Sequence, residues 1–171
     1  MRLPAAPPRL PSMTDTTRLT AVLDRLIRER DSFLVSARAL SPEQLRGPSD
    51  CEEWDRAHVV AHLASNSRAL VNLVDWATSG EPKPIYSSRD ERNRETDELA
   101  QLPPEQLLRT FVENSQYLAE QCERLSGPLE VEELDLNGKT VPSVGIPTVW
   151  ISELVLHHQD LNTGWTVAQA E

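Results

Sequence analysis

The run Val149-Trp150-Ile151-Ser152-Glu153-Leu154-Val155-Leu156-His157-His158 is mostly apolar, and it carries a carboxylate and a histidine at helical spacing. A helix places residues i and i+4 on one face, so Glu153 and His157 project side by side. A helix that is apolar almost all round is buried, and an isolated ionised glutamate there costs several kcal/mol unless it is paired or metal-bound. The sequence therefore predicts a buried helix in which Glu153 has a partner.

A second apolar helical stretch, Val59-Val60-Ala61-His62-Leu63-Ala64, carries His62. Two histidines and one glutamate on different helices suit a divalent metal that keeps an open coordination position. We therefore take His62, Glu153 and His157 as candidate metal ligands. A second interpretation stays open, in which Glu153 pairs with an arginine of the first helix and His62 is an ordinary core histidine. Two-residue helical pairs occur by chance, so the pattern alone does not decide between them.

Apolar periodicity predicts four helices, separated by Pro- and Gly-bearing connections: about 16–40, 55–78, a helix after Pro103 that stops at Gly127-Pro128, and one from Gly145 to about Asn162. The polar stretch 83–102 reads as a long loop with at most one exposed helical turn. Apolar and polar residues alternate in 129–144, and Asn137-Gly138 is a turn signal, so this segment is compatible with a small β-hairpin. These features predict an all-α protein, a four-helix bundle with a small hairpin before the last helix.

Composition narrows the class of protein. The 171 residues suit one domain, assigned to 13–171, and residues 1–12, with four prolines, read as a disordered tail or as sequence upstream of a true start at Met13.

A net charge of −10 with no basic stripe argues against nucleic acid and anionic membranes as partners, and no apolar run approaches a membrane span. Cys51 and Cys122 form no disulfide framework, so a cytoplasmic location is expected. An acidic bundle of this kind is compatible with a homodimer.

Three further residues are candidates for the wall or the support of the site. Asp160 lies about one turn beyond His157, where it either orients that ligand or is simply a charge near the helix end. Trp54 and Trp150 flank the proposed site in sequence and are candidate pocket walls, although core packing is the usual role of such side chains.

The other histidines and Cys51 are weaker candidates. His58 falls well off the apolar stripe of its helix, and His158 points about 100° away from His157, since each helical residue turns by that angle. Cys51 precedes a helix start, where thiol pKa values fall, but a buried inert thiol is commoner, so it is assigned no catalysis. No catalytic residue is named from the sequence.

Three spaced motifs together resemble the DinB-like superfamily and, more narrowly, the mycothiol-dependent maleylpyruvate isomerase N-terminal domain family. Cys51-Glu52-Glu53-Trp54 with Val59-Val60-Ala61-His62-Leu63 is similar to the family's Cys-Pro-Gly-Trp and Val-Val-Ala-His-Leu. Glu153-Leu154-Val155-Leu156-His157 resembles its Glu-x-x-x-His helix, and His157-His158-Gln159-Asp160-Leu161 resembles His-x-x-Asp-Leu. The likeness covers the chain from Met13 onward.

The resemblance implies an up-down-down-up bundle with Zn²⁺ bound by His62, Glu153 and His157. It also implies mycothiol, a small thiol, as cosubstrate and a small electrophile as the second substrate. A divalent metal lowers the pKa of a coordinated thiol, which creates a nucleophile at neutral pH.

The departures from the family pattern shift the expected activity. Glu52-Glu53 stand where the family has Pro-Gly, Ser152 stands where relatives often have arginine, and the isomerases carry a C-terminal domain while this sequence ends at Glu171. We therefore expect a zinc-dependent thiol S-transferase rather than a maleylpyruvate isomerase. A non-catalytic metal-binding or ligand-binding stress-response bundle is the alternative, and a metal-dependent hydrolase ranks third because no general base stands out.

Overall fold

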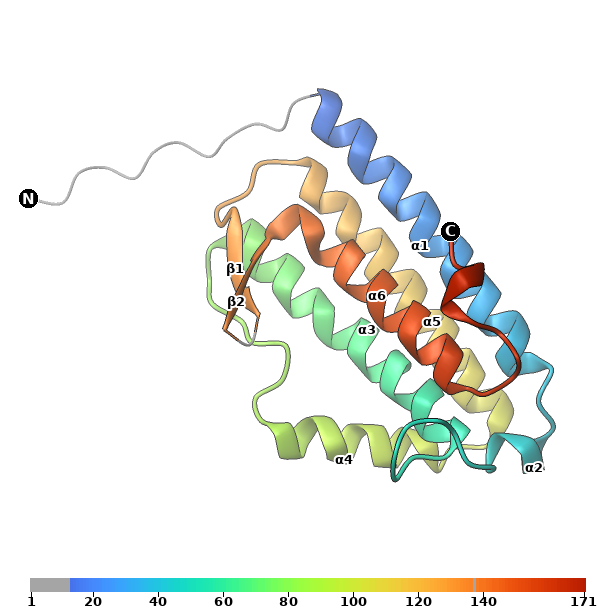
Figure 1. Ribbon diagram of the computed structural model, residues 1–171. Helices are drawn as coiled ribbons and strands as arrows, with labels where there is room; N and C mark the ends of the chain where they lie inside the picture. The colour runs from blue at the N-terminus through green and yellow to red at the C-terminus, as the bar shows by residue number, and fades with distance from the viewer. Residues whose placement is uncertain (1–12, 137) are drawn as a thin grey trace, which may run out of the picture.

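The computed structural model describes residues 13–136 and 138–171, and four long helices form its bundle (Figure 1). These helices are α1 (Met13–Arg38), α3 (Arg56–Ser79), α5 (Pro104–Cys122) and α6 (Ile146–Asp160). Helices α1 and α6 run one way and α3 and α5 run the other way, which is an up-down-down-up order. The predicted all-α bundle is confirmed, whereas the predicted tail, 1–12, lies outside the described residues.

Helix α3 is the centre of the packing, because it contacts α4, α5 and α6, while α1 closes the bundle against α5 and α6. Its Val59–Ala64 run is buried on all sides, as a stretch that is apolar except for His62 requires. Aromatic rings join the other three helices: Phe33 and Phe111 have ring centroids 5.1 Å apart, and Phe111 and Trp150 lie 6.4 Å apart. These rings join α1, α5 and α6, and α3 packs directly against α6, the helix that carries Glu153 and His157.

The short elements agree with the turn signals in the sequence. Ser41 caps α2 (Pro42–Leu45) in a capping box with Gln44. The predicted hairpin is present as β1 (Glu133–Leu136) and β2 (Lys139–Pro142), paired antiparallel with Glu133 opposite Pro142, and β1 packs on α3. Single 3₁₀ turns complete the chain: η1 (Glu123–Ser126), η2 (Ser143–Gly145) and η3 (Val167–Gln169).

The prediction of a loop over 83–102 is wrong, because residues Arg89–Ala100 form helix α4, which lies across one end of the bundle (Figure 1). Its sequence is polar, and only Thr96 and Ala100 are fully buried, so there was almost no apolar stripe to detect. The helix is nucleated instead by its first turn, where the Ser88 side chain accepts a hydrogen bond from the Glu91 backbone N–H. Ser88-Arg89-Asp90-Glu91 has the spacing of a capping box, the signal that periodicity overlooked.

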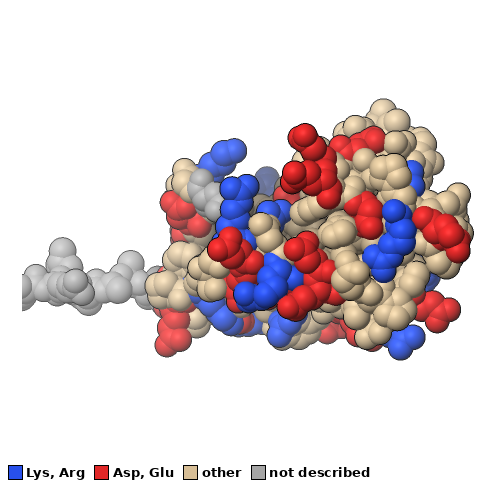
Figure 2. Space-filling model, turned by 90° about the horizontal axis from the view of Figure 1, so that it is seen from below, with Lys and Arg blue, Asp and Glu red and all other residues tan. Residues whose placement is uncertain are grey.

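Charges of both signs cover the face at the α4 end, where acidic and basic side chains lie interspersed (Figure 2). Such mixing agrees with the absence of a basic stripe in the sequence. Among the described residues, no helix combines the length and the apolar character that a membrane crossing demands.

A turn before α3 brings the start of that helix to the end of α6. The Asp50 backbone N–H donates to the Asp160 carbonyl at 2.9 Å, and Arg56 Nε donates to the Leu161 carbonyl at 2.6 Å. Within this turn Glu53 has a φ of +67°, a left-handed conformation that a residue with a Cβ adopts at a cost. This is the position at which the resembled family carries glycine, the residue that adopts this conformation freely.

We expect Glu53→Gly to raise the free energy of unfolding by about 1 kcal/mol, because glycine relieves the left-handed strain. Urea denaturation of the two proteins measures the change. Glu52→Gly is the matched control, since Glu52 is exposed and has no positive φ, and it is expected to give no gain. Equal effects of the two substitutions would contradict the strain at Glu53.

Candidate metal centre

His62, Glu153 and His157 come together between α3 and α6. The His62 Nε2 atom lies 3.1 Å from Glu153 Oε2, and His157 Nε2 lies 3.6 Å from the same oxygen. The two imidazole rings are 4.8 Å apart and nearly perpendicular. One donor atom from each residue lies within 4.8 Å of the other two, which is the spacing of ligands around one cation.

Local sequence explains how each helix presents these side chains. Asp55 caps α3 by accepting from the His58 backbone N–H at 2.9 Å, which starts the helix so that His62 lies in its second turn. On α6 the i, i+4 spacing places Glu153 and His157 on one face, as predicted. Within the described chain, the ion pairs of Glu153 are with the two histidines and not with an arginine of α1.

The electrostatic surroundings favour an ionised Glu153 and a neutral His62, the forms that bind a metal ion, but they favour the protonated form of His157. Hydrogen bonds from His157 and His62 hold the pKa of Glu153 well below its usual range despite burial, so its carboxylate is ionised. Burial lowers the pKa of His62, which is 2% exposed and is therefore neutral near pH 7. Burial alone would also lower the pKa of His157, but Glu153 and Asp160 raise it.

Asp160 fixes the ring of His157. His157 Nδ1 donates to Asp160 Oδ2 at 2.8 Å, so the Nδ1 proton is held there and Nε2 is the nitrogen that faces Glu153. His62 has no such support, because its Nδ1 is buried and lacks a hydrogen-bond partner among the described residues. The two histidines are thus unequal, and only His157 is oriented by a carboxylate.

Cys51 lies beside this pair, a placement that the sequence did not indicate. Its Sγ donates to Asp160 Oδ2 at 3.2 Å and lies 3.8 Å from His157 Nδ1. Burial and the neighbouring Asp160 raise the pKa of the Cys51 thiol to about 12, so it stays protonated in the metal-free protein. Cys122 is also a free cysteine, but it is buried in the core.

The two tryptophans have different surroundings. The ring of Trp54 lies 5.3 Å from that of His62 and 6.4 Å from that of His157, so it covers the histidine pair. Trp150 is fully buried and packs on Phe111, and it is not among the residues that line the cavity described below.

The remaining histidines lie outside the cluster. His58 Nδ1 is 2.7 Å from its capping residue Asp55, and its Nε2 is 3.8 Å from Asp97. His158 is buried on the opposite side of α6, where its Nε2 lies 2.7 Å from Ser36 Oγ and its ring stacks on Trp165 at 3.9 Å. Burial lowers the pKa of His158 to about 4.

A cavity of about 630 Å³ opens onto His62 and Glu153. Its walls come from the segment before α4, from α4 itself and from β1, and they include Pro84, Ile85, Tyr86, Arg89, Arg92 and Leu136. The Arg92 guanidinium lies 5.9 Å from the Trp54 ring, over its face. Sequence reasoning missed Tyr86, Arg89 and Arg92 because it treated this segment as a loop.

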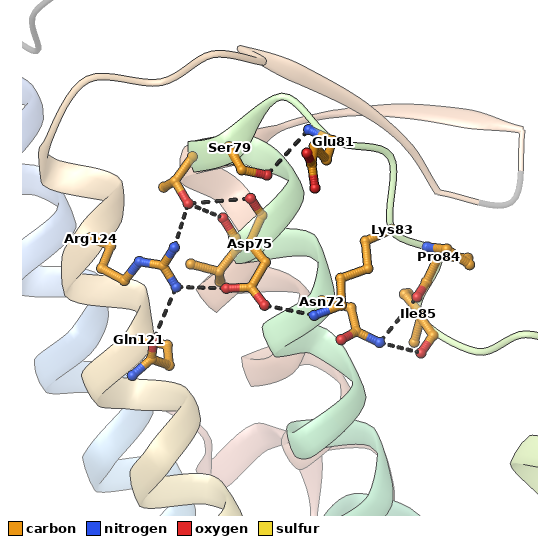
Figure 3. A network of polar contacts seen from close by, with 11 residues as sticks. Asn72, Asp75, Ser79, Glu81, Lys83, Pro84, Ile85, Gln121 and Arg124 are labelled. Atoms are coloured by element: carbon orange, nitrogen blue, oxygen red, sulfur yellow. Dashed lines mark hydrogen bonds and ion pairs between the residues drawn. The ribbon is translucent and has the colours of Figure 1, made fainter.

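Polar contacts anchor the wall segment to α3 (Figure 3). Asn72 Nδ2 donates to the carbonyls of Pro84 and Ile85 at 3.1 and 3.2 Å. Asp75 binds Lys83 at 2.8 Å and Arg124 at 2.7 Å, and these cations hold the pKa of Asp75 below its ordinary value although burial opposes them. The cavity wall is therefore tied to the same helix that carries His62.

Comparisons with known proteins point to one family. The family model described as "Mycothiol maleylpyruvate isomerase N-terminal domain" matches residues 26–162. Two solved structures of mycothiol-dependent maleylpyruvate isomerase, one of them a mutant with alanine in place of a histidine, are 27% and 26% identical in sequence, each with a TM-score of 0.81. Each match covers 90% of this chain, which spans 64% of the length of those proteins. No curated protein matches the sequence.

Replacing His158 with phenylalanine is expected to reduce the acid sensitivity of the fold. The folded-state pKa of His158 is about 4, below the ordinary 6.5, so between these values the unfolded chain binds a proton that the folded chain does not. Stability therefore falls as the pH drops through this window, by about 2 kcal/mol between pH 7 and 4.5. Urea denaturation at both pH values, with chelator present, should show a drop smaller by that amount in the variant. An equal drop in both proteins would contradict this assignment.

Proposed function

Since this chain belongs to the mycothiol maleylpyruvate isomerase N-terminal domain family, we propose that it is a metal-dependent enzyme that prepares a small thiol for attack on an electrophile. The cation is a divalent metal, zinc by family expectation, held by His62 Nε2, Glu153 and His157 Nε2. The thiol is mycothiol or a related compound. The observation that carries the proposal is a half-buried, ionised carboxylate whose ion-pair partners are two imidazoles.

The residues present fit such a cation. A carboxylate and two imidazoles leave a fourth position open in a tetrahedral site, which is the pattern of catalytic rather than structural zinc. Asp160 holds the Nδ1 proton of His157 and leaves Nε2 facing Glu153, and metal-bound histidines commonly donate their other N–H to a carboxylate, a backbone carbonyl or water. A divalent cation bound there supplies Lewis acidity, which lowers the pKa of a thiol that coordinates it.

The chain's own residues organise the remaining steps. Glu153 and the two histidines bind the cation, while Asp160 holds the His157 proton at Nδ1 throughout. Trp54 covers the histidine pair and limits the access of water. The cavity in front of His62 and Glu153 has room for the second substrate, and its Arg89 and Arg92 side chains favour an electrophile that carries negative charge.

We propose the type of reaction and the chemical class of the second substrate. The solved relatives are named as maleylpyruvate isomerases, and this chain spans 64% of their length. Addition of a thiolate to an electrophilic carbon is the step that isomerisation and S-transfer share. We therefore propose thiol transfer to a small electrophile as the activity.

The metal content of the purified, untagged protein tests the centre. After dialysis against zinc and then against metal-free buffer, elemental analysis should find about one zinc per chain. His62→Ala and Glu153→Ala are expected to lose it, whereas His58→Ala, on the same helix but outside the cluster, should retain it. A folded wild type without zinc would overturn the centre, as would a Glu153→Ala, Cys51→Ser double variant that still holds one zinc per chain, because that variant also removes the neighbouring thiol donor.

Consumption of thiol tests the activity. Zinc-loaded wild type is mixed with mycothiol and a panel of small electrophiles, and free thiol is followed over time. We expect at least one electrophile to consume thiol faster with wild type than with Glu153→Ala, whose rate should equal that without protein. If zinc binds but no electrophile gives a difference, the protein is a metal-binding bundle without this chemistry.

A further inference from the structure

The second nitrogen of His157 faces another donor set, on the side of the ring away from Glu153. Cys51 Sγ, His157 Nδ1 and Asp160 Oδ2 form a triangle with sides of 3.8 Å (sulfur to nitrogen), 3.2 Å (sulfur to oxygen) and 2.8 Å (nitrogen to oxygen). All three residues are half-buried. The proposed function uses His157 through Nε2 and leaves the thiol of Cys51 without a role.

We propose that Cys51, His157 and Asp160 form a second cation site that binds thiophilic metal ions such as Cd²⁺ or Cu⁺. The proposed site consists of these three donors alone. It does not require a metal at the first centre, which is formed by His62, Glu153 and His157.

The donor geometry suits a tetrahedral ion. For a zinc-sized tetrahedral ion, with bonds of about 2.3 Å to sulfur and about 2.0 Å to nitrogen or oxygen, neighbouring donors lie roughly 3.3 to 3.6 Å apart. The three observed separations bracket this range, so each donor needs to move by only a few tenths of an ångström. A cysteine sulfur in the set favours soft ions, in contrast to the first centre, whose donors are nitrogen and oxygen.

A surface hollow gives an ion access to Cys51, whereas His157 and Asp160 are not among its lining residues. A shallow hollow of about 490 Å³ lies over Cys51, and its lining includes the acidic residues Asp50, Glu52, Glu53 and Asp55. Negative charge around the opening raises the local concentration of cations. The open side of the hollow leaves room for water as a fourth ligand.

Charge and proton balance are simple for a divalent ion. The Cys51 thiol releases its proton to solvent, and His157 gives up its Nδ1 proton, so that the neutral ring carries its proton on Nε2. The thiolate and the Asp160 carboxylate then carry two negative charges, which neutralise the ion.

The shared histidine makes the two sites compete. A neutral imidazole has one free lone pair, so a metal ion at Nδ1 leaves a proton on Nε2 and removes His157 from the first centre. If the proposed function holds, on which this consequence alone rests, thiophilic ions inhibit the enzyme by taking away one ligand of its catalytic metal.

A cadmium titration of metal-free protein tests the site through the ultraviolet charge-transfer absorbance of cadmium–thiolate bonds. We expect a band that saturates at one Cd²⁺ per chain in wild type. Cys51→Ser should lose the band, and Asp160→Asn should weaken Cd²⁺ binding about tenfold or more. Cys122→Ala is the matched control, because it removes the other thiol of the chain and should keep the band.

His62→Ala separates this proposal from the proposed function, since it disables the first centre but touches none of the three donors. Its cadmium band should persist, whether or not the wild type binds zinc. Circular dichroism confirms that each variant is folded. The absence of a band in wild type, its survival in Cys51→Ser, or its loss in Cys122→Ala or His62→Ala would each overturn the second site.

Discussion

The contact between the Glu153 carboxylate and the two imidazoles is the constraint on which the rest of the structure depends. An ionised carboxylate inside a bundle needs compensation, and here it comes from one histidine on its own helix and one on α3. To bring the three side chains together, α3 and α6 must each be rotated about their axes so that these residues face one another, at matching positions along the two helices. The hydrogen bonds from Asp50 and Arg56 to the end of α6 maintain that register.

Much of the fold followed from apolar periodicity, because α1, α3, α5 and α6 each bury a continuous set of side chains. The three candidate ligands could be grouped for a related reason: helical spacing puts Glu153 and His157 on one face, and an apolar environment singles out His62. That α3 and α6 are neighbours was inferred because helical bundles commonly build metal sites from facing helices, and the family resemblance implied the same three ligands. Whether a metal ion is bound remains a prediction.

The parts that could not be predicted depend on tertiary contacts or on local capping. Helix α4 has almost no buried stripe, so only its Ser88–Glu91 cap marked it, and with it Arg89 and Arg92 were missed as cavity walls. Cys51 meets Asp160 across 109 residues of sequence through a turn whose path no periodicity describes. Trp150 is near Glu153 in sequence, but its ring packs on Phe111 in the core.

The distance along the chain between His62 and Glu153, 91 residues, has a consequence for folding. These donors converge only after α3 and α6 have docked, so a cation that binds both favours the folded chain over the unfolded one and adds its binding free energy to stability. The entropy of closing a loop grows only with the logarithm of its length, so this long closure costs little more than a short one. A metal ion bound here would therefore cross-link α3 to α6 and would stabilise the chain only in its folded form.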